Sequence, residues 1–523
     1  MSAPRRLLCP LGPKRLPLVH DKLPRGRAVE QFDTVTWQKR CSFYPLQIPS
    51  EFSGQSFLPV INRGQCKLLE IIREMRFMPH TRADDSAMLE MLGVSSIDEL
   101  IAHVPAGLRD SATINLPPGL GEPEVVAALS ALAARNRGAH QFASFLGGGY
   151  YRHYVPAAVR AITARAEFAT SYTPYQPEAS QGTTQAIFEF QTLIAQLTGL
   201  DVANASMYDG ASANAEAVLM ARRLMPKRSL VLLARSLWPE YRATIQTYVG
   251  VQPEIELLEF PFDPATGAAD FHALEKVIDG RLLCAVVGYP NVFGVIEPLG
   301  RLAQTVHRAG GLLISATAEA LALGLLKSPG ELGADIAVGE GQSFGLATQF
   351  GGPGLGFMAT QLAHVRQMPG RLVGATVDAR GQRAYCLTLA TREQHIRRER
   401  ATSNICTNHS LCALAATVYL ALMGRQGLRK LAARNVELAH LAAEKLEAAG
   451  IRRCFSGSFF NEFVASPPDP FKALAQAEQR GVIAGIAMVG DYPELTAGLL
   501  ISATELNSLE EIDLLCDALA AAS

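Results

Sequence analysis

Two tyrosine-rich stretches carry side chains whose types and spacing suit a binding site. Three glycines run directly into a pair of tyrosines, and the segment TSYTPYQPEASQGTTQ at 170–185 follows shortly after. Glycine allows close backbone approach, and the two prolines of the second stretch fix φ on both sides of a Tyr–Gln pair, which lowers the entropic cost of presenting it. We predict that these side chains line an active site; the alternative is a glycine turn with core tyrosines. The candidate lining residues are Tyr150, Tyr151, Tyr175, Gln176 and Ser180.

A turn of small residues that opens directly into an alanine-rich helix is a candidate anion site. Asp209, Gly210 and Ser212 lead into this helix. The free N–H groups at a helix N-terminus, beside small side chains, suit a phosphate group. The alternative is an ordinary N-cap by Asp209 or Ser212.

Composition and charge exclude several classes of protein. The formal net charge is −1 over 523 residues, which gives no electrostatic case for nucleic acid or an anionic membrane surface. The 9 cysteines are scattered singly, which suits a reducing cytoplasm rather than a disulfide framework or a zinc site. His80, His153 and His395 are far apart in the sequence, so we expect no metal site. An apolar run around 411–424 is interpreted as a buried helix rather than a membrane span.

The chain falls into four segments by composition and by the pattern of its apolar residues. Residues 1–74 are basic and proline-rich, and we interpret them as a disordered extension, a targeting segment or sequence upstream of a natural start at Met75. Residues 75–144 read as helical, 145–384 as a large domain, and 385–523 as a helical connection followed by a small C-terminal domain.

The large domain is predicted to be α/β. Short apolar runs alternate with helical segments, which indicates a mostly parallel sheet covered on both faces. A helix is predicted to end at Gly199, and two long helices are predicted at about 405–423 and 427–449. The predicted strands are 229–235, 255–260, 282–290, 312–316 and 334–340.

Five long blocks of the chain, in the same order, resemble one family. They are FLGGGYYRHYVPA, YTPYQPEASQGTTQAIFEFQT, TGLDVANASMYDGASANAEA, GADIAVGEGQSFG with FGGPGLGF, and TREQHIRRERATSNICTN. These blocks resemble the pyridoxal-phosphate-dependent P-protein of the glycine cleavage system, and more closely the separate alpha subunit (subunit 1) of its split form. The resemblance runs from about Met75 to the C-terminus.

The resemblance implies a fold, a reaction and a set of partners. The fold is the aspartate-aminotransferase-like, type I pyridoxal-phosphate fold. The reaction is decarboxylation of glycine with transfer of the aminomethyl group to the lipoyl group of the H-protein. The basic run at 391–404 would then lie close to the site, where Arg397 and Arg398 are candidate anion-binding residues; the alternative is a solvated helical face.

The residues that hold the cofactor in such a fold are missing from the expected positions. The Schiff-base lysine should follow the strand ADIAVGE, where the chain has GEGQSFG, and the aspartate for the pyridine nitrogen should stand where Ser315, Ala316 and Thr317 occur. Lys327 comes before that strand, and Glu319 stands two or more positions late. The chain is therefore expected to have no cofactor lysine and no catalytic residue of its own.

The resemblance implies that pyridoxal phosphate is carried by a homologous catalytic subunit 2 in an α2β2 assembly. Loops of this chain would then line the partner's site at the interface, and its own pseudo-active site would be empty or filled by side chains. Two alternatives stay open: a self-sufficient pyridoxal-phosphate lyase or transaminase, and a scaffold that contributes nothing to an active site.

Overall fold

The computed structural model describes residues 80–521 except 113–115, 140 and 406. The extension predicted at 1–74 lies outside the described residues. The chain divides into two compact units at Gly119, so the segment predicted as 75–144 is shared between them. The first unit contains α2 (Arg82–Leu92), α3 (Ile97–Leu100) and α4 (Ala106–Ser111). Thr81 caps α2, because its hydroxyl accepts from the Asp84 N–H and its own N–H donates to the Asp84 carboxylate.

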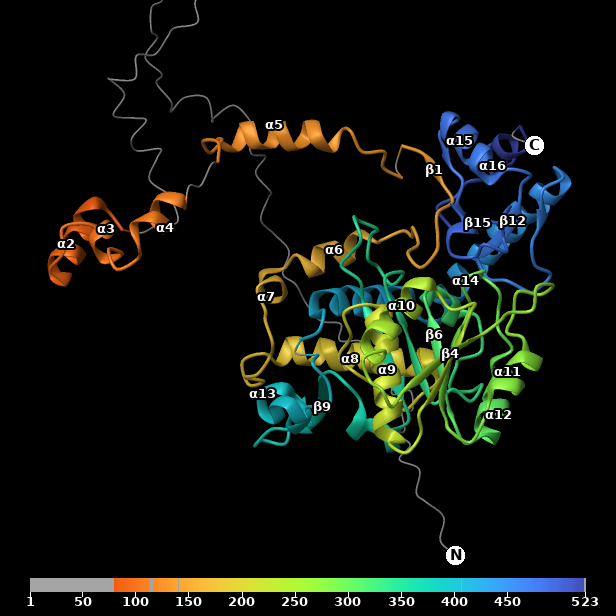
Figure 1. Cartoon of the computed structure of the whole chain (residues 1–523), viewed down its shortest axis with the longest axis horizontal. Helices are drawn as coiled ribbons and strands as arrows, with labels where there is room; N and C mark the ends of the chain where they lie inside the picture. Colours follow the sequence, from red (N-terminus) through yellow and green to blue (C-terminus); the bar gives the residue numbers. More distant parts are fainter. Residues whose placement is uncertain (1–79, 113–115, 140, 406, 522–523) are drawn as a thin grey trace, which may run out of the picture. The chain divides into compact units, whose positions relative to one another are not determined.

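The second unit is built on a seven-stranded sheet (Figure 1). The strand order is β2-β8-β7-β6-β5-β3-β4, and the five strands from β7 to β4 run parallel to one another, while β8 is antiparallel to both neighbours. This confirms the predicted α/β class. The strands are β2 (Val202–Ala203), β3 (Leu230–Ala234), β4 (Glu256–Phe260), β5 (Leu282–Gly288), β6 (Leu312–Thr317), β7 (Ile336–Glu340) and β8 (Gly356–Thr360).

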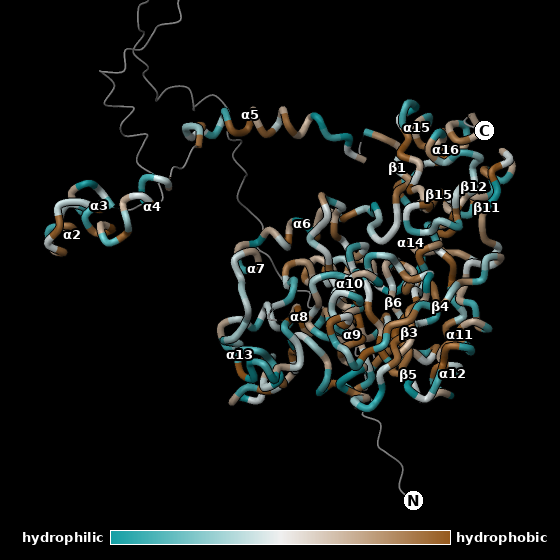
Figure 2. Tube along the Cα trace, in the orientation of Figure 1, coloured by the Kyte–Doolittle hydropathy of each residue, from teal (hydrophilic) through white to brown (hydrophobic). Residues whose placement is uncertain are grey.

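The central strands are buried and mostly apolar because helices cover both faces of the sheet. Every residue of β3, β5 and β7 is buried, and Figure 2 shows hydrophobic residues concentrated on β3, β5 and β6. The edge strand β4 is largely exposed and carries charged residues. The covering helices include α8 (Gln181–Thr198), α9 (Gly210–Leu224), α10 (Pro239–Val249), α11 (Phe271–Val277) and α12 (Leu299–Arg308). The predicted end of α8 is confirmed: Gly199 closes it in the left-handed conformation.

Short elements connect the sheet to the rest of this unit. An antiparallel pair, β9 with β10, lies beside α8, so the predicted domain boundary at 384/385 falls inside a strand. The glycine-rich segment between β7 and β8 connects them as an antiparallel hairpin. These elements are α5 (Glu122–Ala133), β1 (Ala143–Ser144), α6 (Ala157–Thr163), α7 (Ala166–Ala169), η1 (Ala320–Gly324), η2 (Leu362–Gln367), β9 (Leu372–Val377), β10 (Arg383–Thr388), η3 (Ala390–Arg392), α13 (Gln394–Arg397) and η4 (Arg398–Arg400).

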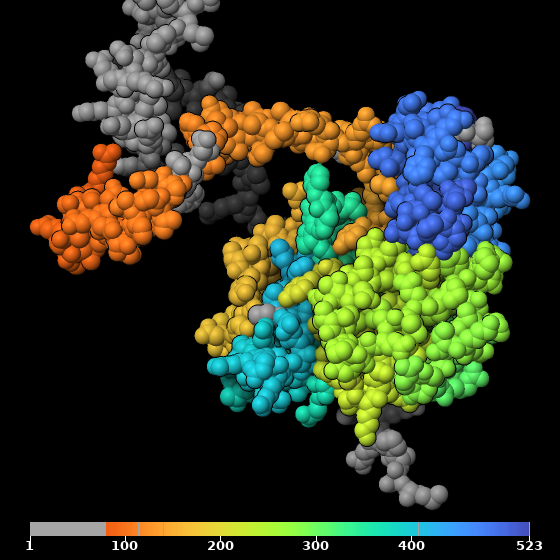
Figure 3. All heavy atoms as spheres, viewed as in Figure 1, coloured from red at the N-terminus to blue at the C-terminus, as the bar shows by residue number. Residues whose placement is uncertain are grey.

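The C-terminal part is a small antiparallel sheet with two helices packed on each other, drawn in blue in Figure 3. Its strand order is β11-β12-β15-β14, and β13 pairs in parallel with β1 from far upstream. The elements are β11 (Arg452–Arg453), β12 (Glu462–Ser466), α15 (Pro470–Gln479), β13 (Val482–Ile483), β14 (Ile486–Ala487), η5 (Met488–Gly490), β15 (Leu499–Ser502) and α16 (Leu509–Ala520).

The long helix α14 (Ser410–Ala448) connects the two parts. Gly424 breaks it with φ 57° and ψ 175°, which matches the two helices predicted from the sequence. By length and composition α14 is apolar enough to cross a membrane, but 50% of its apolar window is buried inside the protein. It packs on α6, α8 and α16, as a core helix does.

Candidate functional site

The start of α9 is the turn that the sequence singles out as an anion site. Asp209 is extended, at φ −157°, and its carboxylate accepts from the Ser212 N–H at 2.7 Å, while the Ser212 hydroxyl accepts from the Asp209 N–H at 3.3 Å. This reciprocal pair is the ordinary N-cap of the alternative interpretation. It leaves the Gly210 N–H pointing out of the helix end, and that N–H donates to Glu340 Oε2 at 3.0 Å.

Glu340, the last residue of β7, places its carboxylate in this turn. Oε1 accepts from the Leu355 N–H at 2.6 Å and from the Gln342 N–H at 3.1 Å. Glu340 is 1% exposed. Burial raises the pKa of Glu340 to about 7, against the three N–H donors, which lower it, and with a further increase from Asp209.

Glycines and tyrosines close the turn over this carboxylate. A Cβ at Gly354, on the β7–β8 hairpin, would lie 2.9 Å from both Glu340 Oε2 and the Tyr150 hydroxyl oxygen, so only glycine allows the hairpin this close. A Cβ at Gly210 would collide with the Tyr241 hydroxyl. Burial, followed by the charges of Glu340 and Asp209, raises the pKa of Tyr150. We name Asp209, Gly210, Tyr241, Glu340 and Gly354 the α9 cradle.

The α9 cradle does not fit pyridoxal phosphate. A phosphate would need the Gly210 N–H, which Glu340 already occupies, and it would meet two carboxylates rather than a cation. Gly341, Gln342 and Ser343 follow β7, with no lysine among them, and β6 ends in Ser315-Ala316-Thr317, without an aspartate. The lysines in the described part of the chain lie elsewhere: Lys227, Lys276, Lys327, Lys430 and Lys472 are exposed, and Lys445 pairs with Asp513.

The tyrosine-rich loop before α8 is held from two sides. Gln181 donates to the Pro177 and Tyr385 carbonyls and accepts from the Tyr385 N–H at 2.9 Å, which ties the loop to β10. The Tyr175 hydroxyl accepts from Arg371 Nη2 at 3.1 Å, and the guanidinium lies 5.4 Å from the Tyr175 ring centre. Tyr175 is nonetheless 51% exposed, so its ring combines a fixed position with a free face.

The structure brings only some of the predicted residues together. Tyr150 lies at the α9 cradle, whereas Tyr175 lies beside Arg371 and His395, with the exposed Gln176 next to it and the half-buried Ser180 at the start of α8. Tyr151 is buried and donates to Glu462, so in this chain it offers no surface to a partner. Whether the other four line a site at an interface stays a prediction.

The arginines Arg397 and Arg398 lie in exposed turns at α13 and η4. Within the described chain, neither forms a hydrogen bond or ion pair with Asp209, Gly210 or Ser212. The buried arginine of this region is Arg371, 4% exposed, whose Nε lies 3.5 Å from Glu393. Both predicted arginines are exposed in this chain, and whether they bind an anion stays a prediction.

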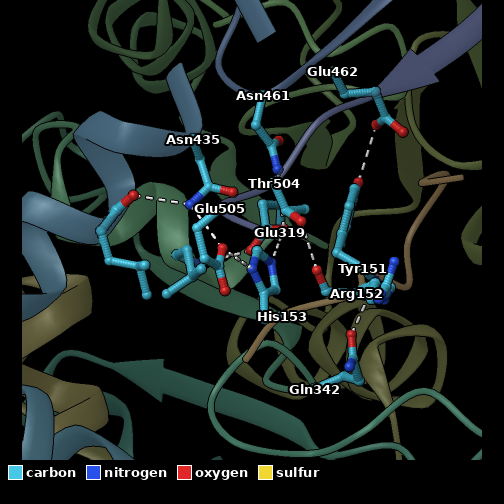
Figure 4. A network of polar contacts seen from close by, with 12 residues as sticks. Tyr151, Arg152, His153, Glu319, Gln342, Asn435, Asn461, Glu462, Thr504 and Glu505 are labelled. Carbon is cyan, nitrogen blue, oxygen red and sulfur yellow. Dashed lines mark hydrogen bonds and ion pairs between the residues drawn. The ribbon is translucent and has the colours of Figure 1, made fainter. Parts of the chain in front are cut away.

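A second polar cluster, which sequence reasoning missed, lies next to Tyr151 (Figure 4). His153 is buried between Glu319 and Glu505, with Nε2 at 3.0 Å from the first carboxylate and Nδ1 at 2.8 Å from the second. Burial acts to lower the pKa of His153, but the two carboxylates outweigh it and raise the pKa to about 10. Glu462 accepts from the Tyr151 hydroxyl at 3.0 Å, and burial raises its pKa to about 8.

Sequence reasoning missed Glu340 and the His153 partners for different reasons. Glu340 stands directly before the position where a lysine was sought, and an acidic residue between two glycines at a strand end was the available signal. Glu319 and Glu505 lie 166 and 352 residues from His153, so no local pattern could connect them. The described residues contain no group of three or more His, Cys, Asp or Glu side chains that could hold a metal ion.

Comparison with known proteins places this geometry in a family. The family model described as glycine cleavage system P-protein matches residues 75–519. A protein of Anaeromyxobacter dehalogenans, named probable glycine dehydrogenase (decarboxylating) subunit 1, is 49% identical over 85% of this chain and 99% of its own length. A protein of the same name from Carboxydothermus hydrogenoformans is 47% identical over the same shares.

Solved structures agree with the sequence comparison. A crystal structure titled glycine decarboxylase (P-protein) of the glycine cleavage system, in inhibitor-bound form, is 43% identical, with a TM-score of 0.79 over 86% of this chain and 100% of that one. A Burkholderia pseudomallei sphingosine-1-phosphate lyase, 16% identical with a TM-score of 0.58 over 79% of this chain and 92% of that one, shares the fold alone. The resemblance drawn from the five sequence blocks is confirmed, and the chain belongs to the glycine cleavage system P-protein family.

Proposed function

We propose that this chain is subunit 1 of a split P-protein, which acts with a homologous second subunit to decarboxylate glycine. The second subunit carries pyridoxal phosphate, and the aminomethyl group passes to the lipoyl group of the H-protein, in an α2β2 assembly. The name subunit 1 on relatives that this chain covers over 99% of their length supports a division of the enzyme between two chains.

Two observations support the placement of the cofactor on the partner. In this chain the Gly210 N–H, at the start of α9, is already bound by Glu340. The strand that should lead to the Schiff-base lysine leads to Gly341-Gln342-Ser343 instead. This chain therefore lacks both a free N–H for the phosphate at Gly210 and a lysine for the Schiff base after β7.

The role of this chain in the assembly is to supply rigid side chains that line the active site of the partner subunit. Tyr175 is fixed by Arg371 and by the prolines around it, yet keeps half of its surface exposed. A wall that is rigid before the subunits meet loses little conformational entropy on assembly. When bound by the partner, pyridoxal phosphate supplies the electron sink for the loss of CO2.

Reconstitution tests the proposal. The purified chain alone is expected to show no absorbance band of bound pyridoxal phosphate and no release of CO2 from carboxyl-labelled glycine, while addition of the second subunit should give both. A cofactor band in this chain alone that disappears on Lys327→Ala would instead establish the self-sufficient enzyme.

Single substitutions in the assembled enzyme distinguish a loop that lines the active site from a loop with a structural role alone. Tyr175→Phe and Gln176→Ala are expected to lower glycine decarboxylation roughly tenfold or more, because small misplacements of a site wall are costly. Tyr172→Phe is the matched control, since Tyr172 is 79% exposed on the same loop. Unchanged activity in both test variants would show that the loop is only structural.

A further inference from the structure

The α9 cradle has the features of an anion site, and the chain fills it from within. The Gly210 N–H stands at the positive end of a 15-residue helix, and two further N–H groups, from Gln342 and Leu355, converge on the same carboxylate. Three backbone donors around one buried anion would equally suit an oxygen-rich ligand. The anion that binds them belongs to Glu340, which lies 130 residues away along the chain.

A second observation shows that the surroundings of the cradle keep an unused donor. The Trp238 ring packs against Tyr241, with ring centres 5.6 Å apart. Trp238 is 2% exposed, and its Nε1 has no hydrogen-bond partner among the described residues. A buried indole N–H usually finds a partner. This unused donor lies beside Gly149, where a Cβ would be 3.9 Å from Nε1, next in the chain to Tyr150 at the cradle.

We propose that Glu340 is a built-in occupant of the α9 cradle, and that its carboxylate keeps phosphate-bearing ligands off this chain. The inference deepens the proposed function, on which it rests, by naming the group that leaves the cofactor to the partner subunit. It acts in two ways. The carboxylate takes the Gly210 N–H, and together with Asp209 it presents negative charge to any arriving phosphate.

The covering residues make the occupation specific for a carboxylate of this chain. Gly354 brings the hairpin backbone down onto Glu340, and the Tyr241 hydroxyl covers Gly210. His409 holds the hairpin in place, because its Nδ1 lies 2.7 Å from the Gly354 carbonyl oxygen. Removing the carboxylate therefore vacates a preformed cradle whose remaining walls are set by other contacts.

The test is anion binding by full-length Glu340→Ala, with inorganic phosphate as the probe and isothermal titration calorimetry as the measurement. The unmodified chain is expected to give no binding heat, whereas the variant is expected to bind phosphate at least tenfold more tightly. Pyridoxal phosphate binding, measured by absorbance, should likewise be tighter in the variant than in the unmodified chain. Formate, which matches the deleted carboxylate, should raise the melting temperature of the variant.

Two matched controls isolate the cradle from general effects. Glu297→Ala removes another buried carboxylate of the same unit, one that accepts from the Ala269 N–H at 2.8 Å. Asp469→Ala frees the exposed N-terminus of α15, where the Asp469 carboxylate accepts from the Phe471 N–H at 3.0 Å. Neither control is expected to gain phosphate binding.

The outcomes separate this inference from the proposed function. If the unmodified chain binds pyridoxal phosphate, both fail. If it does not, and Glu340→Ala gains formate without phosphate, or gains neither, only the present inference fails, because Glu340 is then a structural cap. Glu340→Ser provides a second small side chain should the alanine variant not fold, and failure of both to fold would also count against the inference.

Discussion

Glu340 combines two properties that seldom occur together, full burial and a carboxylate held by backbone donors alone. Its three N–H partners come from α9, from the residues after β7 and from the far side of the β7–β8 hairpin. Each bond favours the charged form, while burial favours the neutral form, and burial is the larger effect on its pKa. One side chain thus joins three segments and leaves the helix end no free N–H at Gly210.

The pKa of Glu340 predicts how stability depends on pH. The carboxyl has a pKa of about 7 when folded, against 4.5 as the ordinary value, so between these limits the folded chain holds a proton that the unfolded chain has lost. This contribution to stability is complete below pH 4.5 and falls as the pH rises to about 7. Glu340→Gln, which does not titrate, should gain about 3 kcal/mol relative to the unmodified chain across that window.

Urea denaturation of both proteins at several pH values between 4.5 and 8 measures this difference. Other titrating groups, Glu462 among them, are common to the two proteins and cancel. Parallel stability curves across the window would show that Glu340 keeps its ordinary pKa in the folded chain.

The helix α14 shows how one glycine sets the course of an element. Gly424 has φ 57° and ψ 175°, a combination that side chains rarely adopt, and no atom lies within 4 Å of a Cβ placed there. Residues on both sides of the break, such as Tyr419 and Leu428, pack in the same core cluster. The glycine is therefore required by backbone conformation rather than by space.

Two glycines three residues apart give a matched test of this point. Gly424→Ala should destabilise the protein by about 1–3 kcal/mol through backbone strain alone. Gly427→Ala should stabilise it by about 0.5–1 kcal/mol, since Gly427 lies in regular helix and its Cβ would meet Met423 at an ordinary 3.6 Å. Thermal melting of the two variants measures both signs, and equal shifts in the same direction would mean that the break is not strained.

At the scale of the molecule, the His153 cluster fastens together segments from the whole length of the second unit. His153 precedes α6, Glu319 follows β6, and Glu505 follows β15. Asn435 of α14 donates to the same Glu505 carboxylate at 3.1 Å, and the Thr504 hydroxyl donates to the Arg152 carbonyl at 2.7 Å. The cluster in Figure 4 is thus where the sheet, the long helix and the C-terminal part meet.

His153→Gln should cost about 3–5 kcal/mol at pH 7, because it leaves the buried Glu319 and the partly buried Glu505 carboxylates without their cation. His153 has a raised pKa of about 10, so its contribution is complete below the ordinary value of 6.5 and is lost as the pH rises through about 10. The variant and the unmodified chain should therefore converge in stability above that pH.

Urea denaturation at pH 7 and pH 10.5 measures the convergence. His440→Gln is the control, since His440 lies on α14, stacks on Phe459 and contacts only a backbone carbonyl through Nε2. If the His153 variant is no less stable than this control at pH 7, protonated His153 does not stabilise the fold through Glu319 and Glu505.

Much of this fold could be predicted from the sequence because its signals are local. Buried strands such as β3 and β5 are continuous apolar runs, and Gly199 marks a helix end. The absence of a lysine directly after β7 can be seen from residue types alone. Local patterns could not predict which of the candidate site residues are exposed. Tyr150 and Tyr151 are neighbours in the same run, yet one is 39% exposed and the other 1%.

By itself, the sequence determined the fold class, the family and the absence of a lysine directly after β7, since each depends on residue types in order along the chain. Only the tertiary structure decided which group binds the Gly210 N–H at the start of α9. The start of α9 and the end of β7 are 130 residues apart and meet only when the sheet forms, so the bond between the Gly210 N–H and Glu340 has no trace in any local pattern. For the same reason, His153 became the centre of a buried ion cluster only when three distant segments closed around it.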